Sequence, residues 1–166
     1  MNLQELKQCL EGIDTTQLYC LGVTVHQHKH IILLGNGGSN AITGHVAQDY
    51  TKALGKKAIC FCDSSRLTCY ANDYGWEHAY AKFLEQFAEP ESLVILISSS
   101  GNSQNILNAA QYCVDNKIHM VTLSGFESDN KLRTLYKNHS LAHFYVPSKD
   151  YGIVEYLHGI ILHSVI

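Results

Sequence analysis

Five short apolar runs, each followed by a segment of helical periodicity, constrain the fold of this chain most strongly. The runs are continuous rather than alternating in polarity, which is typical of strands buried on both faces. The predicted strands are residues 30–34, 57–62, 92–98, 119–123 and 142–146. Strands that alternate with helices build a doubly wound sheet with helices on both faces. The sequence therefore predicts an α/β fold, a three-layer sandwich whose five-stranded parallel sheet is flanked by helices.

The segments between these runs are the predicted helices. They cover residues 39–54, 64–72, 77–87, 102–116, 129–137 and 153 to the end, and an amphipathic helix at about residues 2–20 precedes the first strand. Residues 25–30 (VHQHKH) place three histidines at alternate positions; we interpret them as a solvated lead-in to the first strand, with a metal-binding tag as the alternative. No linker or repeat interrupts the chain, so we expect residues 1–166 to form a single domain.

Composition excludes several function classes. The chain has 166 residues and a net charge of −3, without a basic block, so neither nucleic acid nor an anionic membrane surface is an expected partner. No apolar stretch approaches the roughly 20 residues of a membrane span, and the polar start does not resemble a secretory signal. The six cysteines are irregularly spaced among apolar residues, which favours reduced, buried thiols in a cytoplasmic protein. Cys60 and Cys62 lie in an apolar, strand-like run, so we interpret them as structural rather than as a metal knuckle.

Two polar loops follow predicted strands and open helices. The first, residues 35–40 (GNGGSN), follows the first strand, and the second, residues 98–103 (SSSGNS), follows the third. Ligands of open α/β sheets bind at the carboxyl ends of strands. The N–H groups and the positive dipole end of a helix N-terminus favour an anion there. Glycine permits close backbone approach, and hydroxyls donate hydrogen bonds without charge. The pair of loops therefore predicts a phosphate site.

Neither loop matches a common nucleotide motif. The first lacks the G-x-G-x-x-G spacing of dinucleotide-binding folds, and Asp63 is a weak candidate for the ribose-binding acid that such folds need. No Gly-Lys-Ser/Thr follows, so it is not a P-loop either. The alternative for each loop is a plain strand-to-helix turn with a serine N-cap.

Histidines and carboxylates recur at helical spacing on two predicted helices. His45 and Asp49 are four residues apart and project from one face. Glu155 and His163 are eight apart, which at about 100° per residue leaves an offset near 80°. Two imidazoles and two carboxylates make a divalent-metal site plausible. A half-buried histidine and ordinary surface carboxylates are the alternative for these positions.

Strand–GNGGS–helix followed by strand–SSSGNS–helix resembles the SIS (sugar isomerase) domain of phosphoheptose isomerases, and the resemblance covers roughly residues 31–166. It implies a flavodoxin- or Rossmann-like SIS fold and an aldose–ketose isomerase, most specifically one that converts sedoheptulose 7-phosphate to D-glycero-D-manno-heptose 7-phosphate through an enediol. It also implies lipopolysaccharide or capsule heptose as the pathway. The sugar-phosphate ligands implied by the resemblance are Asn36, Gly37, Gly38, Ser39, Asp73, Ser98, Ser99, Ser100 and Ser103.

The same resemblance implies a zinc site made by His45, Asp49, Glu155 and His163. The family carries glutamate where this chain has Asp49, and glutamine where it has Glu155. The family's glutamate and final histidine shuttle protons, so Asp49 and His163 are the implied catalytic pair. Aspartate is shorter than glutamate by about 1.5 Å. Glu155 is therefore an alternative base, and the sequence leaves the choice between the two carboxylates open.

Two further expectations follow from the resemblance. Isomerases of this kind are homotetramers with sites between subunits, and the apolar last helix offers packing surface. Some SIS proteins do no chemistry, so the alternative function is a non-catalytic module that binds a phosphosugar or a protein partner, as in regulators of replication initiation.

Overall fold

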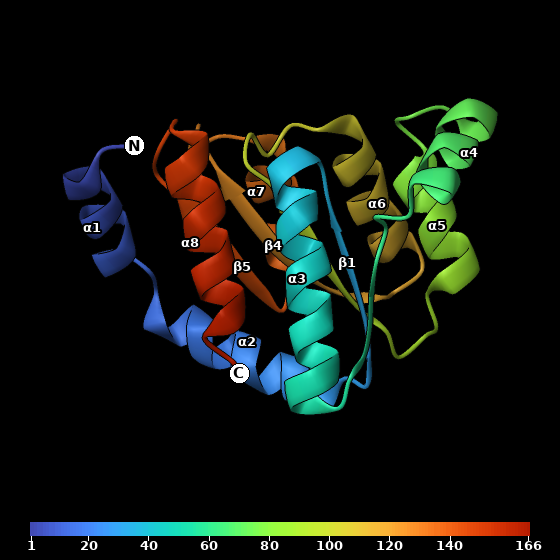
Figure 1. The fold of residues 1–166 in the computed structure, drawn as a ribbon, viewed down its shortest axis with the longest axis horizontal. Helices are drawn as coiled ribbons and strands as arrows, with labels where there is room; N and C mark the ends of the chain where they lie inside the picture. Colours follow the sequence, from blue (N-terminus) through green and yellow to red (C-terminus); the bar gives the residue numbers. More distant parts are fainter.

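The computed structural model describes residues 1–166 and contains one five-stranded parallel sheet in the order β2-β1-β3-β4-β5 (Figure 1). The strands are β1 (His30–Gly35), β2 (Lys57–Cys60), β3 (Leu93–Ser98), β4 (His119–Gly125) and β5 (Ala142–Val146). The predicted α/β sandwich with five parallel strands is confirmed. β1 and β3 are neighbours, and Gly35 pairs with Ile97 at their carboxyl ends. The loops after these two strands therefore leave the sheet side by side, at the switch point where open α/β sheets bind ligands.

Eight α-helices cover the two faces of the sheet. They are α1 (Leu3–Glu11), α2 (Thr15–Gln27), α3 (Gly37–Leu54), α4 (Ser64–Tyr74), α5 (Ala79–Phe87), α6 (Gln104–Asp115), α7 (Lys131–Tyr136) and α8 (Tyr151–His163). Apolar residues of α4, α5, α6 and α7 pack on one face. Those of α2, α3 and α8 pack on the other, where α3 and α8 run next to each other in front of the sheet (Figure 1).

The core consists of these two apolar layers. Successive strand residues point to opposite faces, so Ile31 and Leu33 belong to the layer under α3, while Ile32 and Leu34 belong to the layer under α4 to α7. All four side chains are buried, which explains why the strands read as continuous apolar runs. A third, small cluster joins α1 to α8 through Cys9, Ile153 and Leu157.

The N-terminal segment differs from the prediction of one helix over about residues 2–20. It forms two helices, because Gly12 ends α1 and the side chain of Asp14 accepts hydrogen bonds from the first turn of α2. The second helix continues to Gln27, so the first half of the predicted lead-in at residues 25–30 is helical. Val25, in the last turn of that helix, is fully buried in the core, and its burial explains the longer helix.

The prediction of reduced, buried cysteines is only partly confirmed. All six are free thiols, and Cys9 and Cys113 are buried as expected. Cys62 and Cys69, however, are exposed, because β2 ends at Cys60 and the chain then turns outward into α4. No helix in the chain has both the length and the apolar character needed to cross a membrane.

Candidate active site

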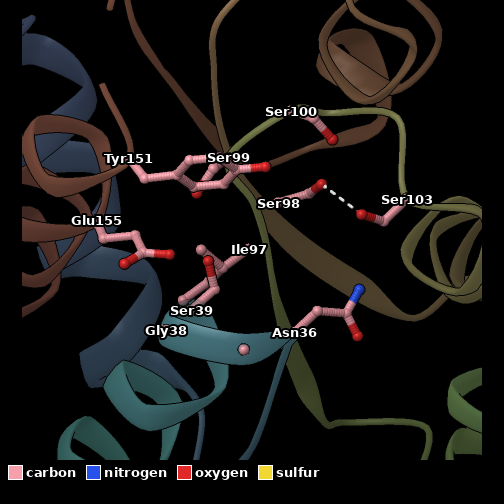
Figure 2. A pocket seen from close by; sticks show the side chains of 11 residues that line it. Asn36, Gly38, Ser39, Ile97, Ser98, Ser99, Ser100, Ser103, Tyr151 and Glu155 are labelled. Atoms are coloured by element: carbon pink, nitrogen blue, oxygen red, sulfur yellow. Dashed lines mark hydrogen bonds between the residues drawn. The ribbon is translucent and has the colours of Figure 1, made fainter. Parts of the chain in front are cut away.

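A cavity of about 250 Å³ opens between the loop after β1 and the loop after β3 (Figure 2). Its lining is mostly backbone, hydroxyl and amide groups, with one carboxylate. The lining residues are Asn36, Gly37, Gly38, Ser39, Ile97, Ser98, Ser99, Ser100, Ser103, Tyr151 and Glu155. The structure thus brings together the loop residues that the sequence singled out.

Two helices direct their N-termini at this cavity without a side-chain cap. Neither the side chain of Asn36 at the start of α3 nor that of Ser103 at the start of α6 accepts a hydrogen bond from its own helix. In contrast, Asn2, Asp14, Asp63 and Asp150 cap the helices that follow them. The first N–H groups of an α-helix have no partner within the helix. An anion in the cavity can therefore receive these donors from both helices, and a simple serine-capped turn does not describe either loop.

The serine loop is fixed by hydrogen bonds at both ends. Ser98 Oγ donates to Ser103 Oγ over 3.2 Å, and the Gly101 amide donates to the Ser98 carbonyl over 2.9 Å. Gly101 has φ +64°, and a Cβ there would overlap the side chain of Asn130. Ser99 Oγ is buried and has no hydrogen-bond partner in the protein. A buried hydroxyl without a partner is costly, and a bound phosphate oxygen would satisfy it.

The first loop is positioned by an amide pair. Asn36 and Asn105 exchange two side-chain hydrogen bonds of 2.9 Å, and the Tyr80 hydroxyl also donates to Asn36 Oδ1 over 3.0 Å. Asn105 lies in the first turn of α6. This contact ties the β1 loop to the helix that follows the serine loop, so the two halves of the cavity are mutually fixed.

Glu155 is the carboxylate of the cavity. It projects from α8 across from the serine loop, on the same side as Tyr151 (Figure 2). Its carboxylate lies on Gly38, where any added Cβ would overlap it. Burial raises the pKa of Glu155 above the ordinary glutamate value. A carboxylate with a raised pKa that faces a polar cavity is a candidate proton acceptor.

His45, Asp49 and His163 converge next to this cavity, between α3 and α8. Asp49 Oδ2 lies 3.0 Å from His163 Nε2 and 3.4 Å from His45 Nε2. The two imidazole rings are 4.9 Å apart. The hydroxyl of Tyr50 donates to the Leu162 carbonyl over 2.8 Å and joins the two helices beside the cluster.

These three side chains fit a divalent metal. Their ligand atoms lie within 4.8 Å of one another, and two tetrahedral ligands at zinc distances are about 3.3 Å apart. His163 Nδ1 lies 2.8 Å from the Gly159 carbonyl, to which an Nδ1–H would donate. In that tautomer Nε2 offers a lone pair beside Asp49 Oδ2, so that a cation could bind between the two. Three protein ligands with an open fourth position are typical of catalytic zinc.

Two other residues of the predicted site, Glu155 and Asp73, lie outside the cluster of His45, Asp49 and His163. However, Glu155 and Gly38 line both the serine cavity and a second hollow of about 640 Å³ that His45 and His163 also line. Asp73 is an exposed residue at the end of α4 and does not line the serine cavity.

Two residues near the cavity were not singled out from the sequence. Tyr151 lines it from the first turn of α8, and its place just after the helix cap Asp150 was the available signal. His158 is fully buried on α8, where its Nε2–H donates to the Ser124 carbonyl over 3.1 Å and its Nδ1 has no partner. Burial lowers the pKa of His158 to about 4, so this imidazole is neutral at pH 7.

The chain is similar to a phosphoheptose isomerase of Fusobacterium nucleatum, with 33% identity over 143 residues that span 83% of this chain and 71% of that protein. It is 31% identical to a phosphoheptose isomerase of Helicobacter pylori over 96% of this chain and 85% of that protein. Its structure superposes on the phosphoheptose isomerase of Neisseria gonorrhoeae with a TM-score of 0.88 and 26% identity, over 96% of this chain and 88% of that one. No protein-family model matches the chain.

Proposed function

The chain belongs to the phosphoheptose isomerase family, and from that premise we propose that it interconverts sedoheptulose 7-phosphate and D-glycero-D-manno-heptose 7-phosphate. The observation that carries the proposal is the placement of Glu155. This carboxylate faces the serine loop across one cavity and also borders the hollow of His45 and His163. One extended sugar phosphate can therefore touch an anion site and a proton acceptor at the same time.

The phosphate end of the substrate binds at the serine loop. Ser98, Ser99, Ser100 and Ser103 supply hydroxyls, and the uncapped first turns of α3 and α6 supply N–H groups. No lysine or arginine lines this cavity. Phosphate recognition then depends on hydroxyl donors and helix termini, both of which bind anions without side-chain charge. Asn36, Gly37, Gly38 and Ser39 contact the sugar chain.

Glu155 acts as the base in this proposal. It takes the proton from the carbon beside the carbonyl, which gives an enediol, and returns a proton to the neighbouring carbon. Asp49 is less suited to this task, because its Oδ2 is already shared by His163 and His45 and it does not line the serine cavity. His163, the other catalytic candidate, lines the adjacent hollow. As a ligand of the metal site proposed below, it would act through the metal rather than carry a proton itself. General acid–base catalysis of this kind contributes roughly 10²- to 10⁴-fold in rate.

The His45, Asp49 and His163 cluster is the proposed zinc site. A bound zinc ion would supply Lewis-acid stabilisation of negative charge on the sugar oxygen. The protein's own part is to fix the ligand geometry, through the His163–Gly159 hydrogen bond and the Tyr50–Leu162 contact between α3 and α8.

The proposal includes the oligomeric state of the protein and its cellular compartment. Tyr151, Tyr156 and Ile160 expose apolar surface along α8 beside the sites. This surface supports a homotetramer whose subunits meet near the cavities. The six free thiols support a reducing compartment, the cytoplasm, and heptose for lipopolysaccharide or capsule is the proposed use of the product.

The decisive experiment is an assay of the purified protein with sedoheptulose 7-phosphate in D₂O, together with metal analysis. The proton taken from C1 exchanges with solvent before it is returned to the enediol at C2, so we expect aldose product that carries deuterium at the former carbonyl carbon, next to the new aldehyde. Sugar-phosphate binding without turnover or deuterium exchange would instead support the non-catalytic module.

A further inference from the structure

Two thiols lie in contact at the end of β2. The Sγ atoms of Cys60 and Cys62 are 3.0 Å apart. Phe61 between them is buried in the layer under α4 to α7, on the opposite side of the strand. Since alternate residues of an extended chain point to the same face, both thiols face α3. This pair belongs to no part of the proposed isomerase site.

The pair lies beside Gly44 of the helix α3. A Cβ on Gly44 would lie 3.9 Å from the Sγ atoms of both Cys60 and Cys62. The two sulfur atoms are therefore held between the backbone of α3 and the end of β2. Cys62 is exposed, whereas Cys60 is half-buried, so a dissolved reagent reaches Cys62 first.

The surroundings favour thiol chemistry over metal binding. The only cluster of three metal-ligating side chains is His45, Asp49 and His163, so the thiol pair lacks a third ligand. Arg66 lines the same hollow as Cys60 and lies with its guanidinium 4.8 Å from the ring centre of Phe87. Burial and the hydrogen bond with Cys62 raise the pKa of Cys60 to about 12, so Cys60 stays a thiol, and the exposed Cys62 is the sulfur that meets a reagent first.

The other thiols have no comparable environment. Cys9 and Cys113 are buried, and Cys20 is half-buried. Cys69 is exposed, but its thiol donates to the Asp73 carboxylate over 3.5 Å, and this hydrogen bond raises the pKa of Cys69. A carboxylate beside a thiol disfavours the reactive thiolate.

We propose that Cys60 and Cys62 form a redox-active dithiol that reacts with hydrogen peroxide or small organic hydroperoxides and closes to an intramolecular disulfide. The Cys62 thiolate attacks a peroxide oxygen, the O–O bond breaks, and the leaving hydroxide takes up a proton to become water. Cys62 is then a sulfenic acid. The Cys60 sulfur attacks the Cys62 sulfur, the S–O bond breaks, and the hydroxide leaves as water with the Cys60 proton. Two thiols and one peroxide thus give one disulfide and two waters, with two electrons passing to the peroxide.

The geometry requires only a short approach of the sulfur atoms. They must move from 3.0 Å to a bond length of about 2.05 Å. No other pair of thiols in the chain is in contact. Closure should therefore be intramolecular and specific to this pair.

The test uses the full-length protein, reduced, desalted and treated with one equivalent of hydrogen peroxide. Trypsin releases residues 58–66 as a peptide that contains Cys60 and Cys62 and no other cysteine. We expect this peptide to lose two hydrogen atoms in mass, the thiol count of the protein to fall from six to four, and dithiothreitol to reverse both changes.

Three variants separate the proposal from general oxidation. Cys60→Ser should stop at a sulfenic acid that dimedone traps on Cys62, and Cys62→Ser should react with peroxide about tenfold more slowly than the wild type. Cys69→Ser, which removes an exposed thiol without a thiol neighbour, should close the disulfide at the wild-type rate. The proposal fails if peptide 58–66 stays reduced after one equivalent, if Cys69 oxidises as fast, or if disulfide-linked dimers form instead.

Discussion

Ser103 gives the simplest residue-level test of phosphate binding. Its hydroxyl accepts from Ser98 and lines the cavity, and a hydrogen bond to a charged group contributes about 1.5–3 kcal/mol. Ser103→Ala should therefore raise KM for the sugar phosphate by roughly ten- to a hundredfold and change kcat less. Steady-state kinetics measure both constants. Ser65→Ala, at an exposed position of α4, is the matched control, and an unchanged KM in Ser103→Ala would remove this serine from the phosphate site.

His158 makes stability depend on pH. Its pKa is lowered by burial to about 4 in the folded protein, whereas an unfolded histidine has a pKa of about 6.5. Between pH 6.5 and 4, His158 is protonated in the unfolded chain but stays neutral in the folded protein, so the unfolded state is favoured. The stabilisation is thus complete above pH 6.5 and is lost as pH falls towards 4, by about 3 kcal/mol.

Urea unfolding at pH 7.5, 6 and 4.5 measures this loss. In His158→Gln the free energy of unfolding should fall less steeply over the same range, because the neutral amide does not titrate. His139→Gln, at an exposed histidine, should keep the wild-type slope. Equal slopes in all three proteins would mean that His158 is not the group responsible.

At the level of secondary-structure elements, the approach of α3 to α8 sets the position of Glu155. Gly38 in the first turn of α3 lies against the Glu155 carboxylate, and an added Cβ would overlap it. Gly38→Ala should push this flexible side chain out of place and lower kcat at least tenfold, while the melting temperature changes little. Gly22→Ala on α2, where a Cβ meets only Val165 Cγ1 at 3.8 Å, should keep full activity. Wild-type kcat in Gly38→Ala would show that the position of Glu155 does not matter.

The positions of the strands could be predicted from the sequence, whereas the placement of Glu155 and Cys62 could not. Continuous apolar runs located all five strands, because burial on both faces leaves that pattern. The predicted offset near 80° allowed Glu155 and His163 to share a broad face, and both line one hollow, but eight residues also span about 12 Å along a helix. That axial distance, which angular reasoning ignores, separates Glu155 from the cluster of His45, Asp49 and His163. Similarly, residue composition alone did not reveal that Cys62 leaves the strand for solvent.

At the scale of the whole molecule, the apolar surface of α8 predicts self-association. Ile160 and Tyr156 are 46% and 64% exposed, although they lie next to a functional cavity. Light scattering of the purified protein should give the mass of a tetramer. Ile160→Glu should lower that mass, and Leu135→Glu, at an exposed apolar residue on α7, should not. A wild-type protein that is monomeric at micromolar concentration would contradict the proposed assembly.

The most direct measurement is kcat for sedoheptulose 7-phosphate in Glu155→Gln. Glutamine keeps the size of the side chain and removes its basicity, and because folding raises the pKa of Glu155 by burial, loss of the charge should not lower stability at pH 7. We predict that kcat falls at least a hundredfold, while the folded structure and the melting temperature are kept. Turnover at the wild-type rate in Glu155→Gln would contradict the assignment of this carboxylate as the group that moves the proton.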